Sequence, residues 1–126
     1  METNNALDAE ILDKKEYINT NTDALILNGF VEYDVRWYLT AEVQINFIGL
    51  ESNIDSLTFP YTMWAGDLSC EITKEQLQAL CTDIMAFKTA CLTSGKTLRD
   101  SLSSLSDEEL VAFVDSRTED SILALI

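Results

Sequence analysis

The 126-residue sequence contains no histidine, and its 22 aspartates and glutamates outnumber its 8 lysines and arginines. The missing histidine excludes histidine-based triads, histidine metal sites and the commonest general base. Nucleic acids and anionic membranes are bound through clustered lysine and arginine, which this chain lacks. We therefore expect neither a nucleic acid nor a membrane among its partners.

Cysteine, proline and long apolar runs are also scarce. Cys70, Cys81 and Cys91 show no CxxC spacing, so the sequence predicts no metal site and no cofactor. Cys81 and Cys91 lie roughly 15 Å apart along a predicted helix, too far for a disulfide. Free thiols suit a protein made in a reducing cytoplasm. The polar N-terminus predicts no secretion signal, and no segment is apolar enough to span a bilayer.

What is present is a hydrophobic fraction of 47% and a net charge of −14. This apolar content is sufficient for one globular core. The acidic residues are spread evenly along the chain, and solubility is the simplest interpretation of the charge. The alternative is a surface that imitates a nucleic-acid backbone and blocks a basic protein.

Periodicity in the first half predicts a short helix over residues 6–18, broken by the Asn/Thr cluster at 19–23. Residues 30–39 have the strongest strand pattern in the sequence, and they would form a hairpin if Asp34 lies in a tight turn. Thr40 then caps a helix that ends near Glu51.

In the second half, residues 57–72 predict two short strands around the turn at 65–67. A capping box at Thr73 starts a helix over 73–94 that Gly95 ends, followed by a short helix over 97–103. A second capping box at Ser106, with Leu105 and Leu110 as a hydrophobic staple, starts a helix that ends near Asp115.

Together these elements predict an α+β fold. A small antiparallel sheet from 30–39 and 57–72 packs against helices 40–51 and 73–94, and the C-terminus is helical. Residues 1–22 form an N-terminal helical attachment segment, and residues 23–126 form a single domain.

Apolar and aromatic side chains are the best candidates for contact with partners. Several of the clustered aromatic residues must fill the core. Tyr61 and Trp64 are the likelier exposed pair because they follow Pro60 on a sheet edge. The cluster comprises Trp37, Tyr38, Phe59, Tyr61 and Trp64. The apolar C-terminus must either fold back or dock on a neighbour. The predicted partner-binding residues are Trp37, Tyr61, Trp64, Ile122, Leu123, Leu125 and Ile126, and the predicted attachment residues are Leu7, Ile11 and Ile18.

Carboxylates are the remaining candidates for chemistry. Asp107, Glu108 and Glu109 are explained by the favourable dipole at a helix start. Glu32 and Asp34 could flank a hydrolytic site for glycans or a calcium ion, but a solvated strand face is the simpler interpretation. We therefore predict no catalytic residues and no enzyme activity.

Two stretches of the sequence carry a shared pattern of apolar, glycine and aromatic residues. The first runs from the glycine-aromatic turn Ile26–Phe30 through Trp37–Leu39 to a helix with a Gly-Leu ending, Ala41–Leu50. The second is Glu71–Phe87 followed by Ser94–Leu98, which has a Gly-x-x-Leu pattern. Together they resemble a phage domain family of unknown function, and the second stretch is similar to that family's C-terminal helix and its Gly-x-x-Leu exit. The resemblance covers roughly residues 23–115.

Domains of that family occur in phage tail-fibre, baseplate and tail-fibre-assembly proteins, often near the end of a longer chain. The resemblance implies a virion accessory or structural protein, or its assembly factor, made in the host cytoplasm. The implied partners are other phage structural proteins, with a homo-oligomer left open. The alternative is the acidic inhibitor of a host defence protein described above.

Overall fold

The computed structural model describes the backbone of residues 2–126 and the side chains of residues 7–126. The fold is α+β, as predicted. Its strands form two separate two-stranded antiparallel sheets rather than one. In chain order the elements are α1 (Glu2–Asn28), β1 (Phe30–Glu32), β2 (Val35–Trp37), α2 (Ala41–Ser52), η1 (Ile54–Ser56), β3 (Tyr61–Ala65), β4 (Leu68–Ile72), α3 (Lys74–Ser101), η2 (Leu102–Ser104), α4 (Asp107–Ala112) and α5 (Glu119–Leu123).

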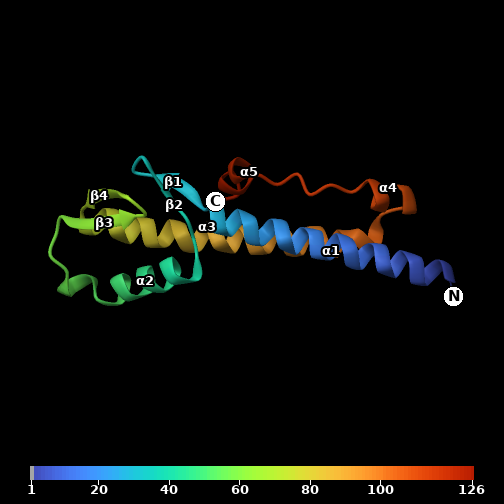
Figure 1. The fold of residues 1–126 in the computed structure, drawn as a ribbon, viewed down its shortest axis with the longest axis horizontal. Helices are drawn as coiled ribbons and strands as arrows, with labels where there is room; N and C mark the ends of the chain where they lie inside the picture. Colours follow the sequence, from blue (N-terminus) through green and yellow to red (C-terminus); the bar gives the residue numbers. More distant parts are fainter. Residues whose placement is uncertain (1) are drawn as a thin grey trace.

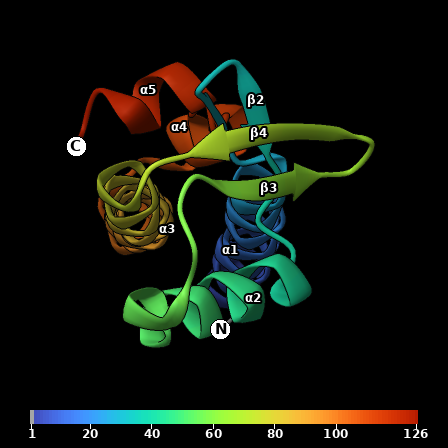
Figure 2. The same cartoon turned by 90° about the vertical axis from the view of Figure 1, so that its left-hand side faces the viewer.

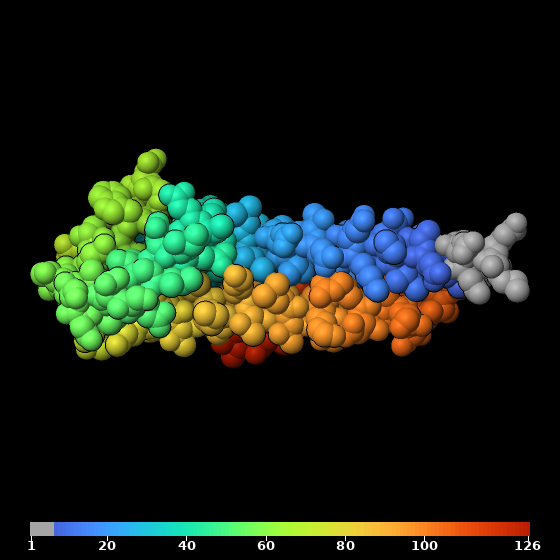
Figure 3. Space-filling model, turned by 90° about the horizontal axis from the view of Figure 1, so that it is seen from below, coloured from blue at the N-terminus to red at the C-terminus, as the bar shows by residue number. Residues whose placement is uncertain are grey.

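The molecule is a rod built on two long helices, α1 and α3, which run antiparallel along each other (Figure 1). Both sheets and α2 gather at one end of this pair, and α4 lies at the other end. From α4 the chain returns along the rod to α5, so the C-terminal segment lies against α3 (Figure 3).

The predicted break in the first helix is wrong, because α1 continues through residues 19–23. Two of its polar side chains, Asn19 and Thr22, are hydrogen-bonded within the fold. The Thr22 hydroxyl donates to the Ile18 carbonyl at 2.7 Å, and the Asn19 side-chain oxygen accepts from Arg99 at 2.7 Å. The expected boundary after residue 22 therefore falls in the middle of a helix.

Helix α1 ends where Gly29 adopts a φ of +61°. A β-carbon at this position would lie 1.7 Å from the Trp37 carbonyl oxygen, so only glycine fits. The chain then forms the β1–β2 hairpin, which was the predicted alternative to a single strand over residues 30–39. Its turn residues, Tyr33 and Asp34, both have positive φ, the geometry of a type I′ turn.

The elements that carry strong local signals form as predicted. Thr40 caps α2 by accepting from the Val43 amide, and Thr73 forms a full capping box at the start of α3. Strands β3 and β4 pair through a turn at Gly66, which has a φ of +63°. The hairpins and α2 share the main core with α3, where Phe30 lies 5.1 Å from Phe87 between ring centroids.

The prediction that Gly95 ends a helix is wrong. Helix α3 continues to Ser101, which also absorbs most of the short helix expected over 97–103. Gly95 is buried in the contact between the two long helices, where a β-carbon would lie 2.8 Å from the Thr22 hydroxyl. Glycine is needed here for close approach of the helices, not for a helix end.

A second, smaller core lies at the far end of the rod. Ile18, Leu102 and Leu110 are buried there, with Leu7, Ile11 and Leu105 packed against them. The predicted staple residues Leu105 and Leu110 thus belong to one cluster. The Ser106 capping box is also present, but α4 ends at Ala112 rather than near Asp115. The chain is then non-helical until α5 begins at Glu119.

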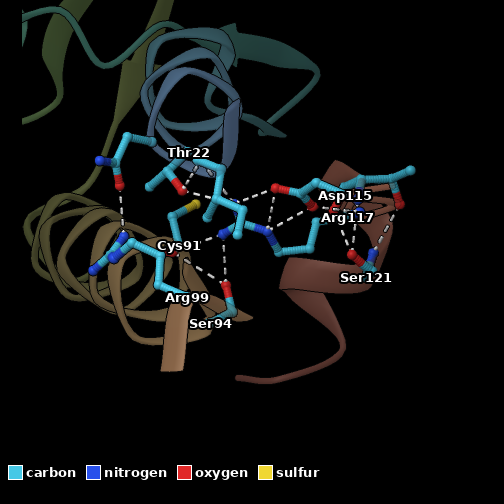
Figure 4. Close-up of polar contacts among 10 residues, drawn as sticks. Thr22, Cys91, Ser94, Arg99, Asp115, Arg117 and Ser121 are labelled. Atoms are coloured by element: carbon cyan, nitrogen blue, oxygen red, sulfur yellow. Dashed lines mark hydrogen bonds and ion pairs between the residues drawn. The ribbon is translucent and has the colours of Figure 1, made fainter. Parts of the chain in front are cut away.

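Arg117, in this returning segment, ties three parts of the chain together (Figure 4). Its guanidinium donates to both carboxylate oxygens of Asp115, at 3.0 and 2.7 Å. It also donates to the carbonyl of Ile18 and the hydroxyl of Thr22 on α1, and to the carbonyl of Cys91 and the hydroxyl of Ser94 on α3. Burial raises the pKa of Asp115, but the hydrogen bonds and charge of Arg117 outweigh burial and hold that pKa below its usual value.

Replacing Arg117 by methionine should lower the free energy of unfolding by about 3–5 kcal/mol, because the fully buried Asp115 carboxylate would lose its counter-ion. Arg36→Met is the matched control. Its partner Glu119 is partly exposed, so we expect a loss of about 0–1 kcal/mol. Urea unfolding followed by circular dichroism measures both values, and equal losses in the two variants would contradict the role assigned to Arg117.

Candidate protein-binding surface

An uncharged groove of about 550 Å³ lies between α2 and β3, at the end of the rod that carries the sheets. Figure 2 shows α2 and β3 on this end, seen along the rod. The groove is lined by Val43, Ile45, Asn46, Phe47, Gly49, Leu50, Asn53, Tyr61, Thr62, Met63 and Trp64. None of these side chains is charged, in a chain whose net charge is −14. We refer to it as the α2–β3 groove.

The predicted aromatic pair lies in this groove. Trp64 is 67% exposed, and Tyr61 is half-buried on the same strand. Trp37 does not belong to the surface, since it is only 2% exposed. Its ring packs edge-on against Phe47 at 5.8 Å, and its indole nitrogen donates to the Glu32 carbonyl. The prediction that Trp37 binds a partner is therefore wrong, and its role is to support the floor of the groove.

The C-terminal candidates divide in the same way. Ile122 is fully buried in the main core, so it cannot contact a partner. Leu123, Leu125 and Ile126 remain exposed beside it. Of the four apolar side chains, only Ile122 is buried in the core, and the other three lie on the surface.

The predicted attachment residues face inward. Ile18 is fully buried, and Leu7 and Ile11 pack against the small core beside α4. Their apolar stripe is used to join α1 to the end of α3 and to α4. These three side chains therefore hold the rod together instead of forming a free attachment face.

Sequence reasoning missed the outer face of α2. Ile45 and Gly49 stand one helical turn apart and line the groove, and Ile45 is 67% exposed. The buried stripe of this helix is centred on Phe47, with Val43 and Leu50 partly buried beside it. An isoleucine outside that stripe was the available signal, because an exposed face needs no apolar residue.

The two carboxylates considered for chemistry, those of Glu32 and Asp34, lie apart in the fold. Asp34 lies exposed in the hairpin turn, so it is not beside Glu32 on a strand face as expected. Glu32 instead meets Asp83 of α3. Burial, followed by the hydrogen bond and the charge of Asp83, raises the pKa of Glu32 to about 7.

The cysteines are free, as predicted. Burial raises the pKa of Cys81 and of Cys91 to about 11, so both are protonated thiols at neutral pH. Among the side chains of residues 7–126, no three histidine, cysteine, aspartate or glutamate groups converge in a way that could hold a metal ion.

The sequence matches one protein-family model. The model of a family described as "Domain of unknown function (DUF4376)" matches residues 9–116. No curated protein and no solved structure matches the chain. Within the described residues, every helix is too short or too polar to cross a membrane.

The Glu32–Asp83 pair should make stability depend on pH. A carboxyl group whose pKa is raised on folding stabilises the fold at low pH, and this contribution is lost as pH rises through about 7. Glu32→Gln can still donate a hydrogen bond to Asp83 without titrating. We expect this variant to melt at a higher temperature than the wild type at pH 8, and to show a flatter melting temperature between pH 5 and 8.

Asp34→Asn is the matched control, since it removes a nearby carboxylate that lies exposed in the turn. It should keep the wild-type dependence on pH. Melting curves of all three proteins across this range test the assignment, which fails if Glu32→Gln and Asp34→Asn behave alike.

Proposed function

We propose that this chain, which belongs to the DUF4376 family, acts by binding other proteins as an accessory or structural component of a phage virion. The observation that carries the binding role is the uncharged α2–β3 groove, with Trp64 and Ile45 exposed on its walls. Large apolar side chains around a groove are typical of protein-interaction sites, because their burial on binding is favourable.

A binding role without catalysis agrees with the chemistry of the described residues. The groove offers aromatic rings, aliphatic side chains and the amides of Asn46 and Asn53, but no acid, base or nucleophilic thiol. Such a lining recognises apolar and hydrogen-bonding groups of a protein surface. Its hydroxyl groups, on Tyr61 and Thr62, have no carboxylate or amine beside them in the lining.

The phage assignment rests on the resemblance of residues 23–115 to domains of tail-fibre, baseplate and tail-assembly proteins. In this proposal the chain is made in the host cytoplasm and joins the particle through the α2–β3 groove. Its partners are other structural proteins of the phage. The rod shape suits such a joint, because the long α1–α3 pair holds the groove at one end of the molecule (Figure 1).

Gly49 allows a sharp test of the groove. A β-carbon at Gly49 would meet no atom within 4 Å, so a larger side chain can enter the groove without disturbing the fold. Gly49→Glu should stay folded, since glutamate favours a helix more than glycine by several tenths of a kcal/mol, on the order of 0.5. Because it places a charge in the uncharged groove, it should reduce the amount of this protein in purified virions at least tenfold.

Gly49→Ala is the matched control, and it should be incorporated like the wild type. Quantitative mass spectrometry of purified virions measures all three proteins. Normal incorporation of Gly49→Glu would contradict the role of the groove. Absence of the wild type from particles, together with its presence on assembly intermediates, would make the chain an assembly factor instead.

The dependence of partner binding on salt separates this proposal from the acidic inhibitor. A mimic of nucleic acid binds through many ion pairs, so its affinity should fall steeply as salt rises. Binding through the uncharged groove should change little over the same range.

A further inference from the structure

A second groove, which is apolar, runs along α3, away from the α2–β3 groove. It has a volume of about 740 Å³ and shares no lining residue with the first. On α3 it is lined by the larger Leu98 and by small side chains, and on the C-terminal segment by Leu125 and Ile126. The small side chains include Ala86, Ala90, Thr93 and Thr97. Figure 3 shows this segment lying against α3. We call this surface the α3 groove.

The charge pattern along the chain singles out this surface. Residues 84–99 form the longest stretch without an aspartate or glutamate, and they include the α3 part of the groove. The only charged side chain in the lining is Arg117, whose guanidinium is committed to Asp115. An acid-free face matters most for contact between two copies of this chain, because each copy carries a net charge of −14.

The shape of the surface also fits a second copy. Leu125 and Ile126 are 63% and 59% exposed, so they stand as an apolar ridge beside a groove of small side chains. A two-fold interface joins identical patches, so it needs a surface that complements itself. A ridge next to a groove meets this need, because each copy can place its ridge in the groove of the other.

We propose that the α3 groove is a homodimer interface in which two copies of α3 pack antiparallel about a two-fold axis. In this arrangement Ala86 faces Thr97 of the second copy and Ala90 faces Thr93. Side chains of this size let two helix backbones approach closely. This inference is independent of the phage assignment and of the α2–β3 groove.

The test uses sedimentation velocity on the purified chain from micromolar to submillimolar concentration. The wild type should reach twice the chain mass of 14.1 kDa. Because salt screens the repulsion between two acidic copies, the dimer should become tighter as salt rises. A partner held by ion pairs would show the opposite dependence.

The double variant Thr89→Glu/Thr93→Glu places two acids in the groove at exposed positions. Glutamate favours a helix at least as well as threonine, so the fold should be retained. We expect its dimer dissociation constant to rise at least 100-fold. Thr82→Glu, at an exposed position of α3 outside the groove, is the control and should remain dimeric.

Circular dichroism verifies that each variant is folded. In the ridge variant Leu125→Ser/Ile126→Ser the folded core is left intact, and we expect this variant to be monomeric as well. A wild type that stays monomeric at every concentration overturns the proposal. So does a dimer that survives the double glutamate variant, or one that grows into larger assemblies with concentration.

Discussion

The contact between α1 and α3 depends on one buried arginine. Arg117 uses its guanidinium donors to reach a carboxylate, two backbone carbonyls and two hydroxyls from three separate segments. Thr22 and Asp115 are buried polar residues, and a β-carbon added at Gly95 would lie 2.8 Å from the Thr22 hydroxyl. Because unpaired buried polar groups are costly, this network fixes where the two helices meet and where the C-terminal segment returns.

Elements that depend on contacts between residues close in sequence could be predicted, and features that depend on contacts between distant residues could not. Thr40, Thr73 and Ser106 cap helices through atoms three residues away, so their signals are complete within a short stretch of sequence. Residues 19–23 and Gly95 gave misleading signals for the opposite reason. Asn19 and Thr22 find partners on α3 and at Arg117, far away in sequence, and these partners make a continuous helix favourable. Local propensity could not reveal them.

The same distinction applies to the candidate binding surface. The exposure of Trp64 could be predicted because Pro60 indicated a strand at an edge, a local property, whereas Tyr61 is half-buried against the main core. Trp37 has the composition of a contact residue, but the fold places Phe47 against its ring and the Glu32 carbonyl at its nitrogen. Whether an aromatic side chain is core or surface depends on what lies opposite it. For Trp37 that neighbour comes from another element, and for Gly49 the decisive fact is that no atom lies opposite.

The distribution of acidic side chains over the surface indicates where contacts with other proteins are favourable. Acidic side chains cover a rod whose two grooves have no acid in their linings. Two acidic surfaces repel each other. Contact through the grooves, which have no acidic side chain in their linings, avoids this repulsion. The two grooves share no residue, so occupation of one leaves the other free. A dimer joined through α3 would carry two α2–β3 grooves, and a partner with repeated sites would then be bound with avidity rather than through a single weak contact.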